Sequence, residues 1–345
     1  MGTSADEDGD RPPGSCPGRT LAPAGTVDRV RESMSGTRSH LVVLGSLNTD
    51  FVARVGELPR PGQTVLGERL LTFAGGKGAN QAVAAARLGA RVTMVGRVGR
   101  DPRGDALFTE LERQGVDTRG VARDPEEPTG AALIVVDRAG ENQIAVTAGA
   151  NGRVDATDVA RALEALEAES MLALQLEIPL EAVARAITEA VRRGHRTILN
   201  AAPGMRLEPG LLRGLEAVVV NQDEAGVLIG RAVAGPAAAL AAARDLHLAG
   251  ARLGVVTLGA AGTAFCDHQG PRLAEPFPVS AVDTTAAGDA FVGALAVALG
   301  ADLPPERAVR LASAAGAAAA TREGAQSSLP TAEDLKAQFG LDWPD

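Results

Sequence analysis

Short apolar runs alternate with longer stretches of helical pattern through most of the chain. The clearest runs are residues 40–45 (HLVVLG), 171–177 (MLALQLE), 196–200 (RTILN), 216–221 (EAVVVN) and 252–259 (RLGVVTLG). Continuous apolar runs of this length are typical of strands that are buried on both faces of a parallel sheet. Their alternation with helical stretches predicts an α/β fold, with a doubly wound, mostly parallel sheet flanked by helices.

Two further segments have a different pattern. Residues 48–73 mix polar and apolar positions in rough alternation around the turn signal PRPGQ. Residues 131–136 and 143–147 flank the turn DRAGEN and predict a hairpin. We expect the strands from about 48–73 and 129–148 to form a small sheet separate from the main one.

The two ends of the chain differ in composition. The first 37 residues are acidic and rich in Gly, Pro and Ser, so we expect residues 1–37 to be a disordered extension. Met34 lies just before the first strand pattern and is a candidate for the native start. Residues 38–345 are expected to form one domain, in which the Ala-rich segments 287–299 and 305–320 predict two helices.

Composition excludes several classes of partner. The net charge is -9 and no block of Lys or Arg occurs, which argues against a nucleic-acid partner. No uninterrupted apolar run reaches the ~18 residues of a membrane-spanning helix, so no membrane partner is expected. Cys16 and Cys266 form neither a disulfide framework nor a zinc-site spacing. A reducing, cytoplasmic setting is therefore predicted.

Several residues suited to ligand binding, most of them polar, follow the predicted strands at or just after their ends. Because ligands of open α/β sheets bind beyond the carboxyl ends of the strands, these residues are candidates for a binding site. They are Asn48, Asp50, Glu177, Asn200, Asn221, Glu224 and Gly259.

Residues 281–294 (AVDTTAAGDAFVGA) carry the strongest candidate chemistry. Ala286, Ala287 and Gly288 are small, and Asp289 is expected to open a helix whose first N–H groups can bind an anion. A phosphate can approach such a backbone closely, and a carboxylate beside it can accept a proton from a hydroxyl. The alternative is that Asp289 only caps the helix.

A second Gly-rich segment, GGKGAN at residues 75–80, precedes a helical stretch. It is not a Walker A loop, because Lys77 is followed by Gly78 rather than Ser or Thr, and it is not GxGxxG. Its backbone, together with Asn80, could hold a polyhydroxylated substrate. The alternative is a flexible turn between a strand and a helix.

Taken together, the motifs identify a family resemblance. The chain resembles the ribokinase-like carbohydrate kinases from about residue 41 to residue 330. The resemblance is carried, in this order, by VVLGSLNTD, PRPGQTV, GGKGANQAVAAARLGA, GENQIAVTAGAN, QLEIP, NAAP, NQDEA, TLGAAG, VDTTAAGD and TREGAQSSLP. It implies a phosphotransferase with an alcohol group as acceptor, which uses ATP to convert D-ribose to D-ribose 5-phosphate.

The resemblance also implies roles for single residues. Asp289 matches the catalytic base, and the backbone N–H groups of Ala286, Ala287 and Gly288 match the anion hole for the transferred phosphoryl group. The residues that match sugar-binding positions, besides Asp289, are Asn48, Thr49, Asp50, Gly76, Lys77, Gly78, Ala79, Asn80 and Glu177.

Nucleotide and metal positions follow from the same resemblance. Glu224 matches a position linked to Mg²⁺ and phosphate. The nucleotide positions are Asn221, Glu224, Thr257, Leu258, Gly259, Ala260, Ala261, Gly262, Gly288, Asp289 and Ser313. A site for an activating K⁺, formed mostly by backbone carbonyls, matches Asp283, Thr285, Ala319, Arg322, Gly324 and Ser328. The small sheet is implied to act as a lid over the sugar and to form the contact of a homodimer.

Three functions remain open on the sequence. The main one is phosphorylation of ribose. A related kinase could act on deoxyribose, another sugar or a nucleoside, although the absence of Tyr and the single Trp offer little stacking surface for a base. The third is a sugar-binding protein without catalysis, which the intact AAGD turn with Asp289 disfavours.

Overall fold

The structure is a computed structural model that describes Met1, residues 39–208 and residues 210–344. Apart from Met1, the expected N-terminal extension lies outside the described residues, as do Met34 and Cys16. In the described part of the chain, no helix is both long and apolar enough to cross a membrane.

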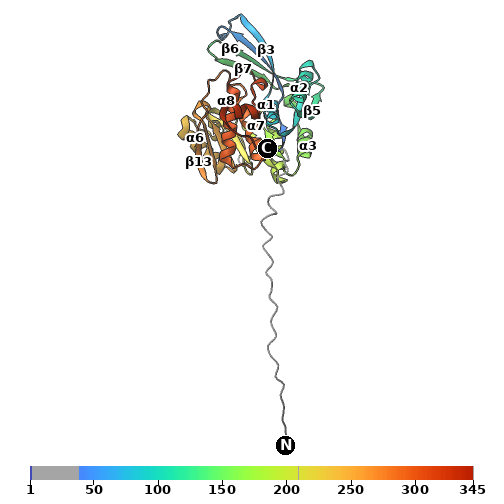
Figure 1. The fold of residues 1–345 in the computed structure, drawn as a ribbon. Coiled ribbons are helices and arrows are strands. Elements are labelled where there is room, and N and C mark those ends of the chain that lie inside the picture. The colour runs from blue at the N-terminus through green and yellow to red at the C-terminus, as the bar shows by residue number, and fades with distance from the viewer. Residues whose placement is uncertain (2–38, 209, 345) are drawn as a thin grey trace. The chain divides into compact units, whose positions relative to one another are not determined.

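The main sheet confirms the expected fold class. Within the described residues it has nine strands in the order β13-β12-β11-β10-β9-β8-β1-β4-β5. Figure 1 shows its edge strands β13 and β5 on opposite sides. Neighbours from β11 to β5 run parallel, whereas β12 and β13 add an antiparallel edge. The bounds are β1 His40–Leu44, β4 Arg91–Gly99, β5 Val116–Asp124, β8 Met171–Leu174, β9 Arg196–Asn200, β10 Ala217–Asn221, β11 Leu253–Thr257, β12 Thr263–Asp267 and β13 Gly270–Ala274.

Alternation of side chains along the buried strands creates two separate cores. In β1, Leu41 and Val43 point to one core, and Val42 and Leu44 point to the other, on the opposite face of the sheet. The first core is covered by α1 (Lys77–Arg87), α2 (Pro102–Arg113), α7 (Ala287–Gly300), α8 (Pro305–Ala320) and α9 (Ala332–Phe339). The second is covered by α3 (Ala156–Ala165), α4 (Leu180–Arg192), α5 (Gln222–Ile229) and α6 (Gly235–Leu248).

The small separate sheet is also present, and its strands lie in the two segments where the sequence placed them. Among the described residues its order is β3-β2-β6-β7, with β2 and β6 parallel and the outer pairs antiparallel. Figure 1 shows this sheet above the layer of helices that contains α1, α7 and α8. Its strands are β2 Asn48–Val55, β3 Gly67–Gly75, β6 Gly130–Val136 and β7 Asn142–Thr147.

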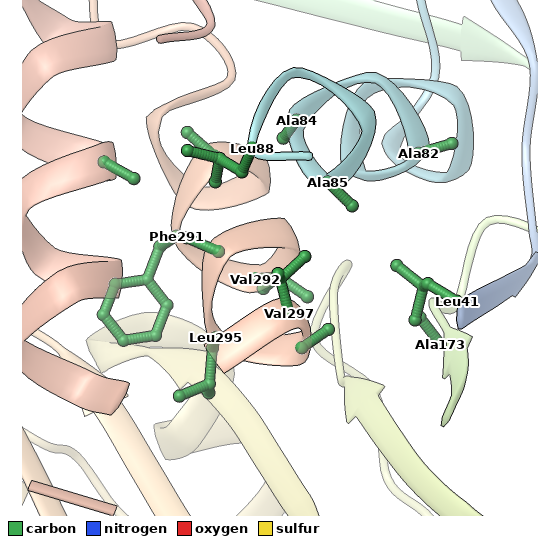
Figure 2. Close-up of a cluster of buried hydrophobic side chains, with 14 of the residues drawn as sticks. Leu41, Ala82, Ala84, Ala85, Leu88, Ala173, Phe291, Val292, Leu295 and Val297 are labelled. Carbon is green, nitrogen blue, oxygen red and sulfur yellow. The ribbon is translucent and has the colours of Figure 1, made fainter. Parts of the chain in front are cut away.

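Close packing of α1 against α7 positions the chemistry. Figure 2 shows Ala84 and Ala85 of α1, and Leu88 directly after it, beside the α7 side chains. At Gly293 of α7, a Cβ atom would lie 2.7 Å from the Cβ of Ala84, which is closer than two non-bonded carbon atoms can approach. The absence of a side chain at Gly293 therefore sets the separation of the two helices. The N-terminal turns of both helices end up in one site as a result.

Candidate active site

Asp289 lies in the first turn of α7, with its carboxylate buried to 7% exposure. Its Oδ2 accepts a hydrogen bond from Nδ2 of Asn80 at 2.9 Å, and its Oδ1 accepts one from Nε2 of Gln81 at 3.1 Å. The helix begins at Ala287 and no side chain caps it, so the prediction that Asp289 opens or caps the helix was wrong. Asp289 is the third residue of the helix and faces α1.

Burial governs the protonation of this carboxylate. Desolvation raises the pKa of Asp289, because the charged form loses its water. The positive charge of Lys77 and the hydrogen bonds from Asn80 and Gln81 oppose this shift. Asp289 therefore has an increased affinity for a proton while its charged form remains stabilised by specific partners.

A chain of buried amides holds Gln81 in place. Its Nε2 also donates to Oδ1 of Asn200 at 3.0 Å, and its Oε1 accepts from Nε2 of Gln175 at 2.6 Å. Asn200 in turn donates to the carbonyl of Val219 at 3.1 Å. The chain fixes the amide of Gln81 so that its N–H₂ group points to Asp289. Sequence reasoning missed Gln81 and Gln175, and only the helical position of Gln81 beside Asn80 could have indicated its role.

The GGKGAN segment packs directly onto the end of β1. Gly76 has a left-handed φ of 89°, and a Cβ there would lie 2.7 Å from the backbone N of Asn48. A Cβ at Gly78 would lie 2.6 Å from the backbone N of Ser46. The glycines are therefore required for a close approach of two backbones, which a flexible turn does not need.

Glu177 connects this segment to the end of β8. Its Oε2 accepts from the hydroxyl of Ser46 at 2.5 Å and from the backbone N–H of Lys77 at 3.1 Å. Lys77 is the first residue of α1. Burial opposes its charged form, but four surrounding carboxylates outweigh burial and raise the pKa of Lys77. Those carboxylates are Asp289, Glu177, Glu224 and Asp50.

Asp50 approaches the same cluster from β2 in the small sheet. A Cβ at Gly75 would lie 2.1 Å from Oδ2 of Asp50, so the carboxylate occupies the space that a side chain at position 75 would need. Burial raises the pKa of Asp50 to about 7, and the negative charges of Glu177 and Asp289 add to the effect. Asp50 thus titrates near neutral pH.

Asn48 is oriented by a residue that the candidate site did not include. Asn151 donates to Oδ1 of Asn48 at 2.7 Å and exchanges two hydrogen bonds with the backbone of Leu47, at 2.9 and 3.0 Å. The side-chain oxygen of Asn48 is thereby engaged, which leaves its N–H₂ group as the donor. Asn151 is the last residue of the GENQIAVTAGAN motif, and that position was the available signal for it.

The predicted anion hole is a tight turn at the start of α7. Ala286 has a left-handed φ of 60°, a conformation that costs a non-Gly residue roughly 1–2 kcal/mol. Ala287 donates its N–H to the carbonyl of Thr284 at 3.2 Å, so this group is already used. Gly288 is exposed, and nothing lies within 4 Å of the position of a Cβ. Strained backbone of this kind is typical of functional sites.

The predicted nucleotide residues lie at the ends of adjacent parallel strands. Asn221 and Thr257 are register partners at the carboxyl ends of β10 and β11. Residues 258–262 form a closed turn, in which the N–H of Leu258 donates to the carbonyl of Gly262 at 2.9 Å. Ser313 of α8 lies 3.1 Å from the hydroxyl of Thr263, directly after this turn. The structure therefore brings these residues to one edge of the sheet.

Glu224 and Asn221 cap α5 together. The side chain of Asn221 accepts from the N–H of Glu224, and Oε2 of Glu224 accepts from the N–H of Asn221, both at 2.8 Å. Burial raises the pKa of Glu224, while this backbone hydrogen bond and the charge of Lys77 oppose the shift. Oε1 of Glu224 accepts no hydrogen bond within the described residues.

The predicted cation residues lie on two hydrogen-bonded segments, 283–285 and 319–328. Asp283 accepts from the N–H of Thr285 and from the N–H of Gly324, both at 2.9 Å. Burial would raise the pKa of Asp283, but these hydrogen bonds prevail and lower it. Among residues 39–208 and 210–344, the backbone carbonyls of Asp283, Thr285, Arg322 and Gly324 accept no hydrogen bond.

A cavity of about 770 Å³ separates the small sheet from these segments. Asp50, Val52 and Arg54 of β2 line one side, and Asp283 and Glu323 line the other. Arg54 and Glu323 meet across it, with Nη2 2.5 Å from Oε1. The ion pair is half-exposed, so it contributes little stability, but it joins the small sheet directly to the 319–328 segment.

Comparison with known proteins identifies the family of this chain. The pfkB family carbohydrate kinases match the chain over residues 38–332. The chain belongs to this family.

No cluster of three or more His, Cys, Asp or Glu side chains that could hold a metal ion occurs in the part of the chain that the structure describes.

Individual relatives are named for sugar phosphorylation. A ribokinase from Haemophilus influenzae is 38% identical over 297 residues, which cover 86% of this chain and 97% of that protein. A deoxyribokinase from Salmonella typhi is 34% identical over 302 residues, covering 87% and 99%. A solved structure of Arabidopsis thaliana ribokinase with ribose and ATP has a TM-score of 0.79 and 29% identity, covering 89% of this chain and 100% of that one.

The electrostatics of the cluster predict a pH effect. Replacing Lys77 by Met removes the positive charge that lowers the pKa values of Asp50 and Asp289, so both values should rise. The family resemblance implies that deprotonated Asp289 is the catalytic base, so the acid limb of the kcat/KM profile should move to higher pH. Lys336→Met, which removes an exposed Lys paired with Asp342, should leave the profile unchanged. If the acid limb of Lys77→Met stays at the wild-type pH, the influence of Lys77 on the pKa of the catalytic base is contradicted.

Proposed function

We propose that this protein catalyses the ATP-dependent phosphorylation of D-ribose to D-ribose 5-phosphate, with Asp289 as the general base. The observation that carries the proposal is the buried carboxylate of Asp289, which two amides orient at the strained N-terminus of α7. The ribokinase of Haemophilus influenzae, which is 38% identical and matched over 97% of its length, supports ribose as the acceptor.

The reaction requires one proton transfer and one phosphoryl transfer. Asp289 accepts the proton of the sugar hydroxyl while the hydroxyl oxygen bonds to the γ-phosphorus of ATP. The bond from that phosphorus to the β–γ bridging oxygen breaks, and ADP leaves. The N–H groups of Ala286 and Gly288, which donate to no acceptor among the described residues, stabilise the negative charge on the transferred group, and the positive end of the α7 dipole adds to this effect.

The sugar hydroxyls are recognised by paired polar side chains. Asn48 donates through its N–H₂ group, since Asn151 occupies its oxygen. Asn80 has a buried Oδ1 without a partner among the described residues, and this atom can accept from a hydroxyl. Asp50 and Glu177 complete the set as acceptors. In the rest of the GGKGAN segment, the backbone N–H groups of Lys77, Gly78 and Ala79 donate to Glu177 and Ser46, and so hold the segment in place beside the sugar.

The nucleotide binds along the ends of β10 and β11. Asn221, the turn from Thr257 to Gly262 and Ser313 form one continuous edge there, which supports their assignment to the nucleotide. Glu224 fits a role toward Mg²⁺, because its Oε1 is available while Oε2 stays in the helix cap. Bound Mg²⁺ would neutralise charge on the phosphates of ATP.

The 283–285 and 319–328 segments suit a monovalent cation such as K⁺. The lowered pKa of Asp283 keeps its carboxylate charged, and four nearby carbonyls are unused among the described residues. A bound K⁺ would supply positive charge that organises these segments. Asp283, Thr285, Arg322, Gly324, Ala319 and Ser328 would hold it.

The small sheet is proposed to be a lid and the contact of a homodimer. Ile144 and Val146 lie on one face of its edge strand β7, and each is 56% exposed. An exposed apolar face of this kind fits a second copy of the lid. Sedimentation velocity should show a dimer, and Ile144→Lys should yield monomers. A monomeric wild type would contradict this proposal.

A reducing, cytoplasmic setting remains our expectation, and cell fractionation would test it.

Release of ADP from MgATP tests the substrate. We expect the highest kcat/KM with D-ribose among ribose, 2-deoxyribose, fructose and adenosine, and a higher rate with K⁺ than with Na⁺. The deoxyribokinase relative makes 2-deoxyribose the second candidate. A site that bonds the 2-hydroxyl should reject deoxyribose strongly, since the loss leaves a buried polar group unpaired. Preferential turnover of deoxyribose would move the assignment to that sugar, and no turnover at all would favour a non-catalytic binder.

A further inference from the structure

A second cavity, of about 380 Å³, lies at the root of the lid. Thr49 of β2 lines it, and because strand side chains alternate between faces, Thr49 faces away from Asn48 and Asp50. The cavity is therefore separate from the sugar site. Its walls come from the lid root, from the C-terminal parts of α1 and α2, and from the segment before Ser328; the polar members are Thr49, Thr72, Arg87, Glu110, Arg113, Gln326 and Ser327.

Two arginines, Arg87 and Arg113, and one carboxylate, Glu110, line this cavity. Arg87, the last residue of α1, donates through Nε to Gln114 and through Nη1 to the carbonyl of Leu329. Its Nη2 has no partner within the described residues. Burial lowers the pKa of Arg87, and the positive charge of Arg113 lowers it further. Arg113 uses Nε and Nη2 to hold Glu110, so Nη1 of Arg113 also remains available.

Gln326 provides an independent sign of a ligand. Its side chain lines the cavity at only 4% exposure, and neither its oxygen nor its nitrogen has a hydrogen-bond partner among the described residues. Leaving such a buried group unsatisfied costs about 1–3 kcal/mol. A ligand that supplies both an acceptor and a donor would remove this cost.

We propose that this cavity binds a small metabolite that carries an oxyanion, a phosphate or carboxylate, together with a hydroxyl group. The free N–H groups of Arg87 and Arg113 bind the anionic oxygens. The amide of Gln326 donates to the oxyanion and accepts from the hydroxyl, and Thr49 and Thr72 add further hydroxyl contacts. A volume of about 380 Å³ is within the range of small-molecule sites.

Binding at this cavity should influence the sugar site. The ligand would contact four parts of the molecule at once: the lid root, α1, α2 and the segment next to Ser328. Its binding would therefore favour the closed arrangement, in which these four parts lie together. Thr49 lies between Asn48 and Asp50, so this arrangement also fixes two sugar-binding candidates. By linkage, the oxyanion should raise the affinity for sugar, and sugar should raise the affinity for the oxyanion.

Isothermal titration calorimetry with inorganic phosphate and with malate tests the site. The enzyme is first saturated with ribose and a non-hydrolysable ATP analogue, so that the anion hole is occupied, and ionic strength is matched with sodium chloride. We expect saturable binding of at least one probe, and the tighter of the two identifies the oxyanion. Arg113→Gln and Gln326→Met should each weaken it about tenfold.

Arg192→Gln is the matched control. Arg192 holds Glu189 one helical turn away, as Arg113 holds Glu110, and both Arg side chains are 66% exposed. Its variant should bind the probes as the wild type does. Binding of neither probe, or equal binding by Arg113→Gln, Gln326→Met and wild type, would overturn the proposal.

The affinity for ribose without nucleotide provides the second readout, which rests on ribose as the substrate. It should rise with the bound probe in the wild type and in Arg192→Gln, and stay constant in Arg113→Gln. A wild-type affinity for ribose that ignores the probe would overturn the coupling. Failure to bind ribose at all would instead contradict the proposed function. In that case, the affinity of the cavity for the probe can still be measured with the ATP analogue alone.

Discussion

Placing the carboxylate of Asp289 in a buried position removes its hydration, and the surrounding elements compensate for that loss. Asn80 and Gln81 of α1 donate to its two oxygens, and Lys77 at the start of the same helix supplies positive charge. These contacts exist only because α1 and α7 pack closely at Gly293. Helix packing and electrostatics of the site are thus one constraint, since separating the helices would leave a buried charge without partners.

The same constraint explains why glycine and amide residues surround the site. Gly75, Gly76 and Gly78 let the start of α1 approach Asp50 and the end of β1, so that four carboxylates gather near Lys77. The small sheet contributes Asp50 and, through Arg54, contacts Glu323 in the proposed cation segment. The proposed sugar, base and cation sites are therefore connected through short, direct contacts rather than through distant parts of the fold.

Much of this arrangement could be predicted from the sequence, for physical reasons. Apolar runs such as HLVVLG report burial on both faces of a sheet, and strand ends place Asn48 and Glu177 at one edge. The pattern did not reveal β5, β12 or β13, whose residues mix polar and apolar positions at an edge of the sheet. It also could not reveal Gln81, Gln175 and Asn151, because their roles depend on contacts between residues far apart in the chain. The cavity at Gln326 likewise depends on the small sheet, α1, α2 and the segment before Ser328, which only the fold brings together.

Turnover of Asp289→Asn tests the central claim most directly. The amide keeps the shape of the side chain and removes the base. The account predicts that kcat falls by about 10²–10⁴-fold. The affinities for ribose and ATP, measured by calorimetry, should stay close to those of wild type. Asp342→Asn, an exposed Asp paired with Lys336, serves as the control and should retain full turnover. A near-normal kcat in Asp289→Asn would contradict the account, because the carboxylate would then not accept the proton.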